Sequence, residues 1–388
     1  MKSRKLSRRR SRTAIVSAAA ASVVAGVALV PNWSAGAAVV NDPTVDASTK
    51  ATFQKLADAV FTDRTQALVH GAAKKQSTSR FSGDVRLSST QSRDESSALT
   101  QLRGRQTKLA EVGETYSAGT TKVTLDATRV TGRTAKADVT ETTTLTYAKV
   151  TGDAPKSTDF QAHHELTFKA DQRGTWQLSK IEDTDEGGLA VNTLSKPAVK
   201  APAPADDGNT TPDAPRAATT RNPVAVPKTS TTYDYKAMAA YAEKYWNVYN
   251  TDYPNFNGHA DGGDCTNFVS QSLKAGGWKH VPGYVYDYTK WFGTADIQSD
   301  SFVGVNEWSW FAQNSKRTTP LANVYQAEVG DVIQVDFDRD GAKDHTMIVT
   351  YKANGVPYVT YHSNNTLRRS LSSLIASYPN AYYYAYRT

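Results

Sequence analysis

The sequence predicts an α+β protein with two domains separated by a proline-rich segment. Upstream of residue 196, apolar residues at helical spacing give way to the two-residue alternation of long strands. Downstream of residue 232, a helix that starts at a cysteine precedes three short strands. Residues 196–232 between them hold seven of the fifteen prolines. We expect domains at 38–195 and 233–388, joined by an extended spacer with nothing to pack against.

The charge of the chain is concentrated at its start. The formal net charge over 388 residues is +7, and the first 37 residues contain seven Lys or Arg and no acid. Without that segment, 38 bases face 38 acids. The rest of the chain therefore gives no electrostatic argument for binding nucleic acid or anionic lipid.

Residues 1–37 have the order of an export signal. A basic run precedes the apolar stretch Thr13–Val30, and Ala35-Gly36-Ala37 follows as a small-residue cleavage site. An uncleaved membrane anchor is the alternative, because 18 apolar residues are just enough to span a bilayer. The pair Arg8-Arg9 leaves general secretion and the twin-arginine route both open. We expect a secreted protein, extracellular or associated with the cell wall.

The region 38–195 reads as helices followed by long antiparallel strands. Its first helix is indicated by the spacing of Phe53, Leu56, Val60 and their neighbours, and alternation begins after residue 119. This order of elements resembles the cone-shaped NTF2-like and SnoaL-like domains, which implies an α+β cone. His163 and His164 are adjacent on a strand and therefore point to opposite faces, one solvated and one in the interior. A spacing or docking role, with a partner that the sequence does not identify, is the default expectation.

Cys265 is the candidate nucleophile. It is the only cysteine of the chain, so no internal disulfide can form. Asp264 suits a helix N-cap and Gly276 a C-cap, which places Cys265 in the first turn of a helix. Unpaired backbone N–H groups and the helix dipole favour a thiolate there, so we expect a lowered pKa. A buried structural cysteine is the alternative.

His345 and His362 are the candidate partners of Cys265. The sequence predicts a strand at 332–337, a second strand from His345 to residue 351, a turn at Asn354-Gly355 and a third strand ending at His362. If these strands pair across the turn, the two histidines lie nearly opposite each other. His345 would then be the general base and acid, and His362 would orient the His345 ring. Asn364 is the alternative third member.

Other interpretations of these residues stay open. Cys265, His345 and His362 together have ligand types that bind zinc, and each histidine has a structural interpretation as a strand residue. Asp264 is expected to act as a cap rather than as a catalytic acid.

An acidic turn and several tryptophans also have two interpretations. Asp336, Asp338, Asp340 and Gly341 match the start of a calcium loop, but Met347 stands where a Glu ligand belongs, so a solvated acidic turn is the expectation. Four tryptophans either line a substrate groove or fill the core: Trp278, Trp291, Trp308 and Trp310.

The region 233–388 carries a family resemblance. DCTNFVSQSLKAGG, GDVIQVDFDRDGAKDHTMIV and VTYHSNNTLRRSL together resemble the putative amidase domain family of exported bacterial proteins, which is similar to the NlpC/P60 and CHAP peptidases. The resemblance implies a papain-like fold, with a helix-borne Cys265 packed on an antiparallel sheet and His345 and His362 on later strands. Thr266-Asn267 replaces the Ser-Gly that usually follows Asp-Cys in NlpC/P60 proteins, which weakens any inference of peptidoglycan specificity.

The sequence therefore supports two functional hypotheses. The first is an exported cysteine hydrolase, without a cofactor, that cleaves an amide or peptide bond through a thioester, in cell-envelope material. The second is a non-catalytic wall-associated protein that binds peptide or glycan.

Overall fold

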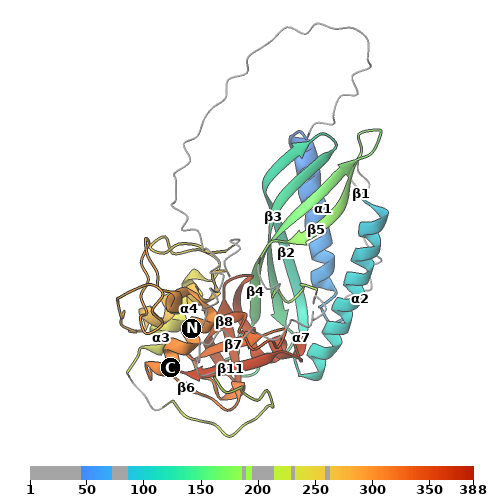
Figure 1. Cartoon of the computed structure of the whole chain (residues 1–388). Helices are drawn as coiled ribbons and strands as arrows, with labels where there is room; N and C mark the ends of the chain where they lie inside the picture. The colour runs from blue at the N-terminus through green and yellow to red at the C-terminus, as the bar shows by residue number, and fades with distance from the viewer. Residues whose placement is uncertain (1–44, 72–85, 186–188, 195–213, 229–231, 258–262) are drawn as a thin grey trace, which may run out of the picture. The chain divides into compact units, whose positions relative to one another are not determined.

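The computed structural model describes residues 45–71, 86–185, 189–194, 214–228, 232–257 and 263–388 (Figure 1). Residues 42–388 form one compact unit. The fold is α+β, as predicted, and the described residues form one large mixed sheet of eleven strands. The predicted export signal, 1–37, lies outside the described residues. Within the part of the chain that is described, no helix has the length and apolar character to cross a membrane.

Within its described residues, the first part of the unit contains two helices and five strands. Helix α1 begins after Asp46, whose carboxylate accepts the Thr49 N–H, and α2 begins after Ser88 in the same manner. The predicted apolar residues of α1 are buried, and Phe53 stacks on Phe168 with ring centroids 3.7 Å apart. The elements are α1 (Ala47–Gln66), β1 (Arg86–Leu87), α2 (Ser89–Glu111), β2 (Tyr116–Thr131), β3 (Thr134–Tyr147), β4 (Ser157–Ala170) and β5 (Trp176–Asp183).

The second part contains the predicted cysteine helix and strands, together with further elements. The predicted turn is present, with positive φ at Asn354 and Gly355. The elements are α3 (Tyr235–Tyr245), α4 (Cys265–Ala275), α5 (Asp300–Val303), α6 (Val305–Asn314), β6 (Thr319–Pro320), η1 (Val324–Gln326), β7 (Val332–Asp336), β8 (His345–Ala353), β9 (Val356–Tyr361), β10 (Asn365–Ser370), α7 (Leu371–Ser377) and β11 (Tyr382–Arg387).

The sheet places its strands in the order β1-β5-β4-β10-β9-β8-β7-β11-β6, and β3 pairs with both β2 and β4. β1 and β5 are parallel, and the other pairs are antiparallel. Strand β10 joins the two parts of the unit, because Asn365, Thr366 and Leu367 pair with residues of β4.

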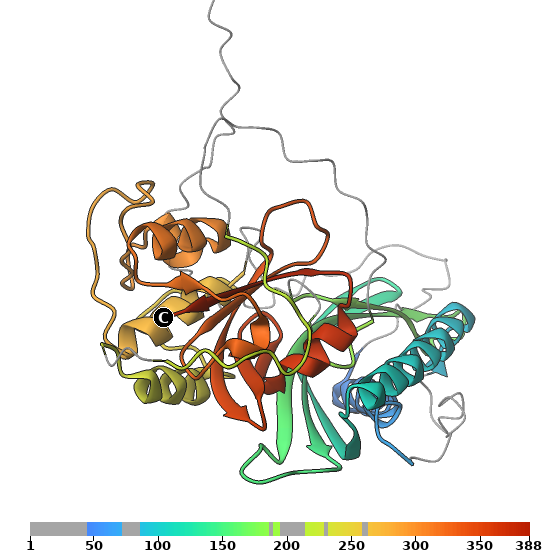
Figure 2. The same ribbon diagram turned by 90° about the horizontal axis from the view of Figure 1, so that it is seen from below.

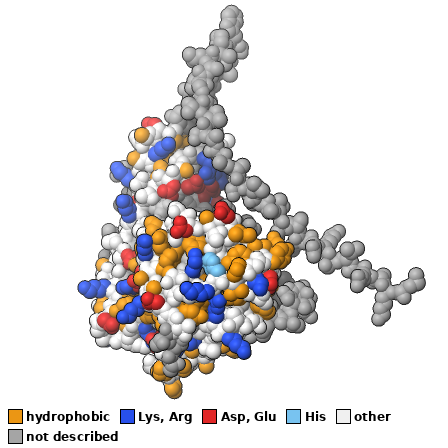
Figure 3. All heavy atoms as spheres, turned by 90° about the vertical axis from the view of Figure 1, so that its left-hand side faces the viewer, with side chains coloured by type: hydrophobic (Ala, Val, Ile, Leu, Met, Phe, Trp, Pro, Cys, Tyr) orange, Lys and Arg blue, Asp and Glu red, His pale blue; other side chains and the backbone are white. Residues whose placement is uncertain are grey.

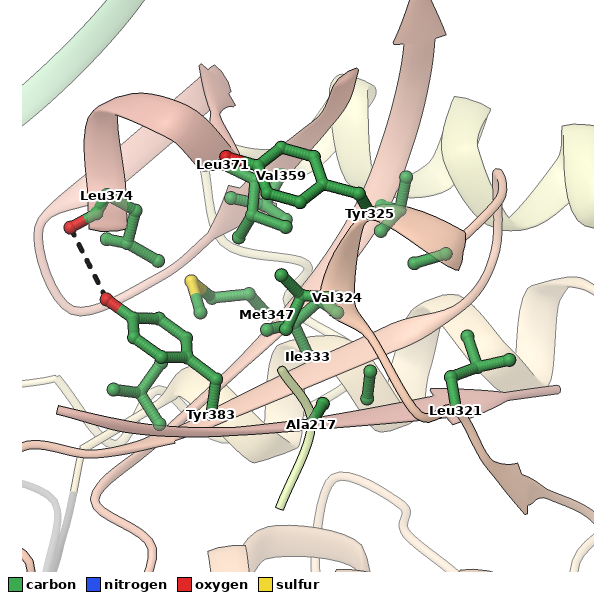
Figure 4. Close-up of a cluster of buried hydrophobic side chains, with 14 of the residues drawn as sticks. Ala217, Leu321, Val324, Tyr325, Ile333, Met347, Val359, Leu371, Leu374 and Tyr383 are labelled. Carbon is green, nitrogen blue, oxygen red and sulfur yellow. Dashed lines mark hydrogen bonds between the residues drawn. The ribbon is translucent and has the colours of Figure 1, made fainter. Parts of the chain in front are cut away.

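Helices cover both faces of the second part of the sheet. On one face, α3, α4 and α6 contribute a cluster that includes Met238, Phe268 and Trp308 (Figure 2). On the other face, η1 and α7 close a second cluster around Met347 (Figure 4). In this cluster the Tyr383 hydroxyl donates to the Leu374 carbonyl at 3.4 Å. Successive side chains of β8 therefore alternate between the two clusters: Met347 and Val349 face the second cluster, and Ile348 faces the first.

The described part of the predicted spacer, residues 214–228, differs from the expectation of a segment with nothing to pack against. Ala214 and Ala217 are buried in the two clusters, and the Ala217 N–H donates to the Tyr383 carbonyl at 2.8 Å. Lys228 forms an ion pair with the buried Asp331 at 2.7 Å. Proline and alanine here form an extended strap along the sheet, because small side chains allow the backbone to approach it closely.

The tryptophans mostly belong to the core. Trp278, Trp291 and Trp308 are at most 1% exposed, which favours the core interpretation over a substrate groove for these three. Trp310 is partly buried and contacts Tyr288. Large apolar side chains are still present on the surface, and Figure 3 shows a face on which they gather among Lys and Arg side chains.

The two adjacent histidines of β4 face opposite sides, as predicted. His163 is partly exposed and pairs with Asp185 at 2.8 Å. His164 is buried, with Nδ1 2.8 Å from Asp183 and Nε2 3.2 Å from Glu141. Burial opposes a charge on this ring, but the two carboxylates outweigh it and raise the pKa of His164 to about 9. His164 is therefore a charged interior residue.

This charge makes the stability of the protein depend on pH. Because the folded-state pKa of about 9 lies above the ordinary 6.5, the stabilisation is complete below pH 6.5 and is lost as pH rises through 9. The free-energy difference between the protein and His164→Gln should fall by about 3 kcal/mol between pH 6 and pH 9.5. Urea unfolding at both pH values measures it, and a pH-independent difference would contradict the charged assignment.

Candidate active site

Cys265 is the first residue of α4, as the sequence predicts. Phe268, Val269 and Leu273 anchor the helix in the cluster beneath it, and Gly276 is the C-cap. The helix is 11 residues long, and its first turn lies against β8. Cys265 is 1% exposed, so the sulfur is enclosed in this structure.

The surroundings of Cys265 favour a neutral thiol. Its Sγ lies 3.8 Å from the Thr266 hydroxyl and within hydrogen-bonding reach of the Thr346 backbone. Thr266 and Thr346 are joined by a 2.9 Å hydrogen bond, which ties the start of α4 to the start of β8. Burial raises the pKa of Cys265 to about 11, and these hydrogen bonds lower it only in part. The predicted lowering of this pKa is therefore wrong for the enclosed thiol.

His345 begins β8, also as predicted, and pairs with Val335 of β7. Its ring is 2% exposed and meets Tyr361 edge to face at 5.0 Å. The Nε2 atom is buried and has no hydrogen-bond partner among the described residues. Burial alone lowers the pKa of His345 to about 3, so the ring is a neutral imidazole.

His362 does not orient His345, which corrects the predicted triad. Its Nδ1 lies 2.6 Å from the Asp264 carboxylate, and its Nε2 lies 2.8 Å from the Tyr245 carbonyl. Because a carbonyl can only accept, Nε2 carries a proton and donates to Tyr245, and Nδ1 faces the carboxylate. The ring stacks on Phe268 at a centroid distance of 4.0 Å and lies tilted against Tyr249 at 4.6 Å. His362 thus belongs to a buried ion pair with Asp264.

A β-bulge explains why the two histidines part. Near the turn, β8 and β9 pair Tyr351 with Tyr358, but beyond it they pair Val349 with Val359, so Thr350 is an extra residue. From Val349 back to His345, the side chains of β8 consequently lie on the opposite face from the one that an unbroken pairing with β9 would give them. Thr346 now shares a face with His362, and His345 faces the cluster on the other side of the sheet.

Asn364 does not replace His362 as the third member. Its Oδ1 accepts the N–H groups of Leu189 and Ala190, and its Nδ2 donates to Asp185 at 2.8 Å. All three partners lie in the segment that follows β5. Asn364 therefore connects the strand after His362 to the first part of the unit.

Asp264 has a role that the sequence did not reveal. It stands at the N-cap position, but its side chain makes no capping hydrogen bond. One carboxylate oxygen binds His362, and the other accepts the N–H of Phe256 and the amide of Asn267. The prediction that Asp264 is the N-cap residue is therefore confirmed, but the prediction that its side chain caps the helix is wrong. Its partner His362 is 98 residues away, so no local pattern could show the pairing.

Metal binding finds limited support. Among the described residues, Asp336, Asp338 and Asp340 are the only group of three His, Cys, Asp or Glu side chains close enough to hold an ion. Their carboxylates already accept backbone N–H groups of the same turn, which agrees with a solvated acidic turn. Cys265, His345 and His362 do not form such a group, which removes the zinc alternative.

Comparisons with known proteins match the segment of the chain that contains these residues. Residues 232–386 match the family described as "Putative amidase domain". Two curated relatives come from Bacillus subtilis (strain 168): "Uncharacterized protein YhbB" is 36% identical over 126 residues, and "Uncharacterized protein YjcM" is 32% identical over 142 residues. These matches cover 32% and 35% of this chain and 39% and 32% of the relatives. No solved structure matches.

Alkylation of Cys265 should report the raised pKa. With a pKa of about 11, the rate of reaction with iodoacetamide should continue to rise by about tenfold per pH unit from pH 7 to pH 10, because only the thiolate reacts. A free thiol with a pKa of about 8.5 levels off within that range and serves as the control. Since the chain has one cysteine, mass spectrometry of the intact protein measures the rate directly. A rate that is already constant at pH 7 would contradict the neutral thiol.

The Asp264–His362 pair should be strongly coupled. Asp264→Asn and His362→Gln each leave one buried polar group without its hydrogen-bond partner, so each should lower the free energy of unfolding by about 1–3 kcal/mol. The double variant places two neutral amides together and should lose less than the sum of the single losses. Chemical unfolding of the four proteins measures the coupling. Additive losses would show that the two side chains do not interact.

Proposed function

We propose that this protein is an exported cysteine-dependent amidase that hydrolyses an amide or peptide bond of cell-envelope material. The observation that carries the proposal is the placement of Cys265 at the start of α4 against the first residues of β8, within the segment that matches the amidase family. Thr346, which follows His345, is the residue whose backbone reaches the thiol. Cys265 and His345 thus belong to two segments in direct contact, but the His345 ring lies on the other face of the sheet, so the proposed reaction requires this ring to turn toward the thiol.

In the proposed reaction, Cys265 is the nucleophile and His345 is the general base. His345 takes the thiol proton as the sulfur attacks the carbonyl carbon, and it returns that proton to the nitrogen as the C–N bond breaks. Water, deprotonated by His345, then attacks the thioester carbonyl carbon; the C–S bond breaks, the acid is released, and His345 returns the proton to the Cys265 sulfur. The backbone N–H of Cys265, at a helix start, is suited to bind the oxyanion.

Both groups are buried and neutral, each on its own face of the sheet, which defines how the reaction would begin. A thiol with a raised pKa and an imidazole with a lowered pKa form no resting ion pair. Proton transfer would therefore accompany attack on the substrate rather than precede it. His362 acts only as a positioning residue, because its ion pair with Asp264 fixes the residue that precedes Cys265.

The finer parts of the proposal rest on the sequence. The basic and apolar order of residues 1–37 supports export, by either secretion route, to the extracellular space or the cell wall. The helix-borne cysteine beside an antiparallel sheet supports a papain-like arrangement for 233–388. Two helices packed on long antiparallel strands support an NTF2-like arrangement for 38–195. Cell-wall peptide is the substrate class that this combination favours.

One observation favours the non-catalytic alternative, in which the protein binds wall peptide or glycan. Cys265 is enclosed and its thiol is neutral, as in a structural cysteine. Hydrolysis separates the two functions, since a binding protein retains its ligand unchanged.

Substitution of Cys265 and His345 tests the proposal. Cys265→Ser and His345→Gln should each abolish the release of new amines from purified wall material or a peptide library, and their combination should add little because they act as a unit. His280→Gln is the matched control, since this histidine lies at the other end of α4 near Trp291. Mass spectrometry detects the amines. A Cys265→Ser protein with full activity would exclude the cysteine mechanism.

A further inference from the structure

A pocket lies where the strap, the segment after α6 and the end of β11 meet. Its cavity volume is about 730 Å³, which falls in the range of small-molecule sites. The residues that line it include Lys228, Tyr233, Arg317, Thr318, Leu321 and Arg387. None of these lining residues belongs to the candidate active site, and Cys265 lies at the opposite end of α4 from Trp278, against which Arg317 packs.

Arg317 brings an uncompensated positive charge to this pocket. Its guanidinium carbon lies 5.2 Å from the ring centroids of Trp278 and Phe311 and 5.7 Å from that of Trp291. The rings hold the planar group in place, but among the described residues no carboxylate pairs with it and its Nη1 atom is buried without a hydrogen-bond partner. Burial lowers the pKa of Arg317, opposed only by a nearby tyrosine, Tyr233.

Two further donors near Arg317 also lack acceptors. Thr318 is 5% exposed and lines the same pocket, and its buried hydroxyl has no partner among the described residues. The Nε1 of Trp278 is likewise buried and unpartnered. Buried polar groups are normally hydrogen-bonded, so a cluster of three unpaired donors indicates a missing acceptor.

The charges around the pocket are mostly positive. Of the described residues that line it, four are Lys or Arg and none is Asp or Glu. Lys228 and Arg387 share one carboxylate, that of Asp331, at 2.7 and 2.8 Å. Thr388 also lines the pocket, and its main-chain oxygen accepts the Tyr235 hydroxyl at 2.9 Å. Asp331 therefore compensates Lys228 and Arg387, whereas no described carboxylate compensates the positive charge of Arg317.

We propose that this pocket binds an organic carboxylate, whose carboxyl group accepts from Arg317 and Thr318 and whose apolar part packs on Leu321 and Tyr233. A guanidinium matches the planar geometry of a carboxylate, and the hydroxyl supplies a further donor. The mixed lining favours an anion that carries an apolar group over a small inorganic ion. The same chemistry is presented by an acylated amino acid and by the free end of a peptide.

Calorimetric titration of the full chain with N-acetyl-L-leucine tests the proposal. Its neutral amide, N-acetyl-L-leucinamide, has the same shape without the charge and should bind at least about tenfold more weakly, as expected when a charged hydrogen bond is lost. Inorganic phosphate tests for a simple anion site and should also bind more weakly. N-acetyl-leucyl-alanine, which carries its carboxylate one residue further along, shows whether a peptide end is preferred over an acylated amino acid.

Three variants assign the binding to this pocket. Arg317→Met keeps the apolar stem and should weaken binding of N-acetyl-L-leucine by at least about tenfold, whereas Arg93→Met on the exposed surface of α2 should leave it unchanged. Thr318→Val is nearly isosteric and should weaken binding even if Arg317→Met does not fold. Equal binding of acid and amide, equal binding of phosphate, or the absence of binding would overturn the proposal.

Discussion

The buried ion pair between Asp264 and His362 fixes the second part of the protein around its candidate nucleophile. Asp264 immediately precedes Cys265, and His362 follows β9 and also donates to the Tyr245 carbonyl at the end of α3. One interaction thus determines where α3 ends, where α4 begins and how β9 leaves the sheet. Such a pair contributes little net stability, since both charges must be desolvated. Its value is positional, because a helix start displaced by one residue would turn Cys265 away from β8.

The sequence was sufficient to predict most of the elements near this pair but not how they meet. Local composition predicts the strand that begins at His345, the strand that ends near His362 and the turn at Asn354-Gly355 between them. The bulge at Thr350 does not, because no glycine marks it and its hydroxyl bonds across the strands to Thr360. That extra residue decides which histidine faces α4. Strand β11 was also missed, since four of its six residues are buried and no alternation identifies it.

The first part of the protein reaches further into the second than its composition suggests. Asn364 is held by Asp185 and by the backbone of Leu189 and Ala190, and Arg369, fully buried, donates to the Leu189 carbonyl. These contacts lie within a few residues of His362. Long-range pairing of this kind leaves no periodic signal in a single sequence. The link between β9 and β10 is consequently held by Asp264, which precedes the cysteine helix, and by the segment after β5.

Helix α4 also separates the two sites that we assign to the second part. Its 11 residues span about 16 Å, with Cys265 at one end and Trp278, against which Arg317 packs, just beyond the other. An extended peptide advances about 3.3–3.6 Å per residue, so a carboxylate bound at Arg317 could belong to the same peptide as an amide at Cys265 only if about five residues lay between them. A shorter anion would instead bind independently of the thiol. The length of the ligand therefore decides whether the pocket selects the substrate of the candidate active site or acts as a separate site.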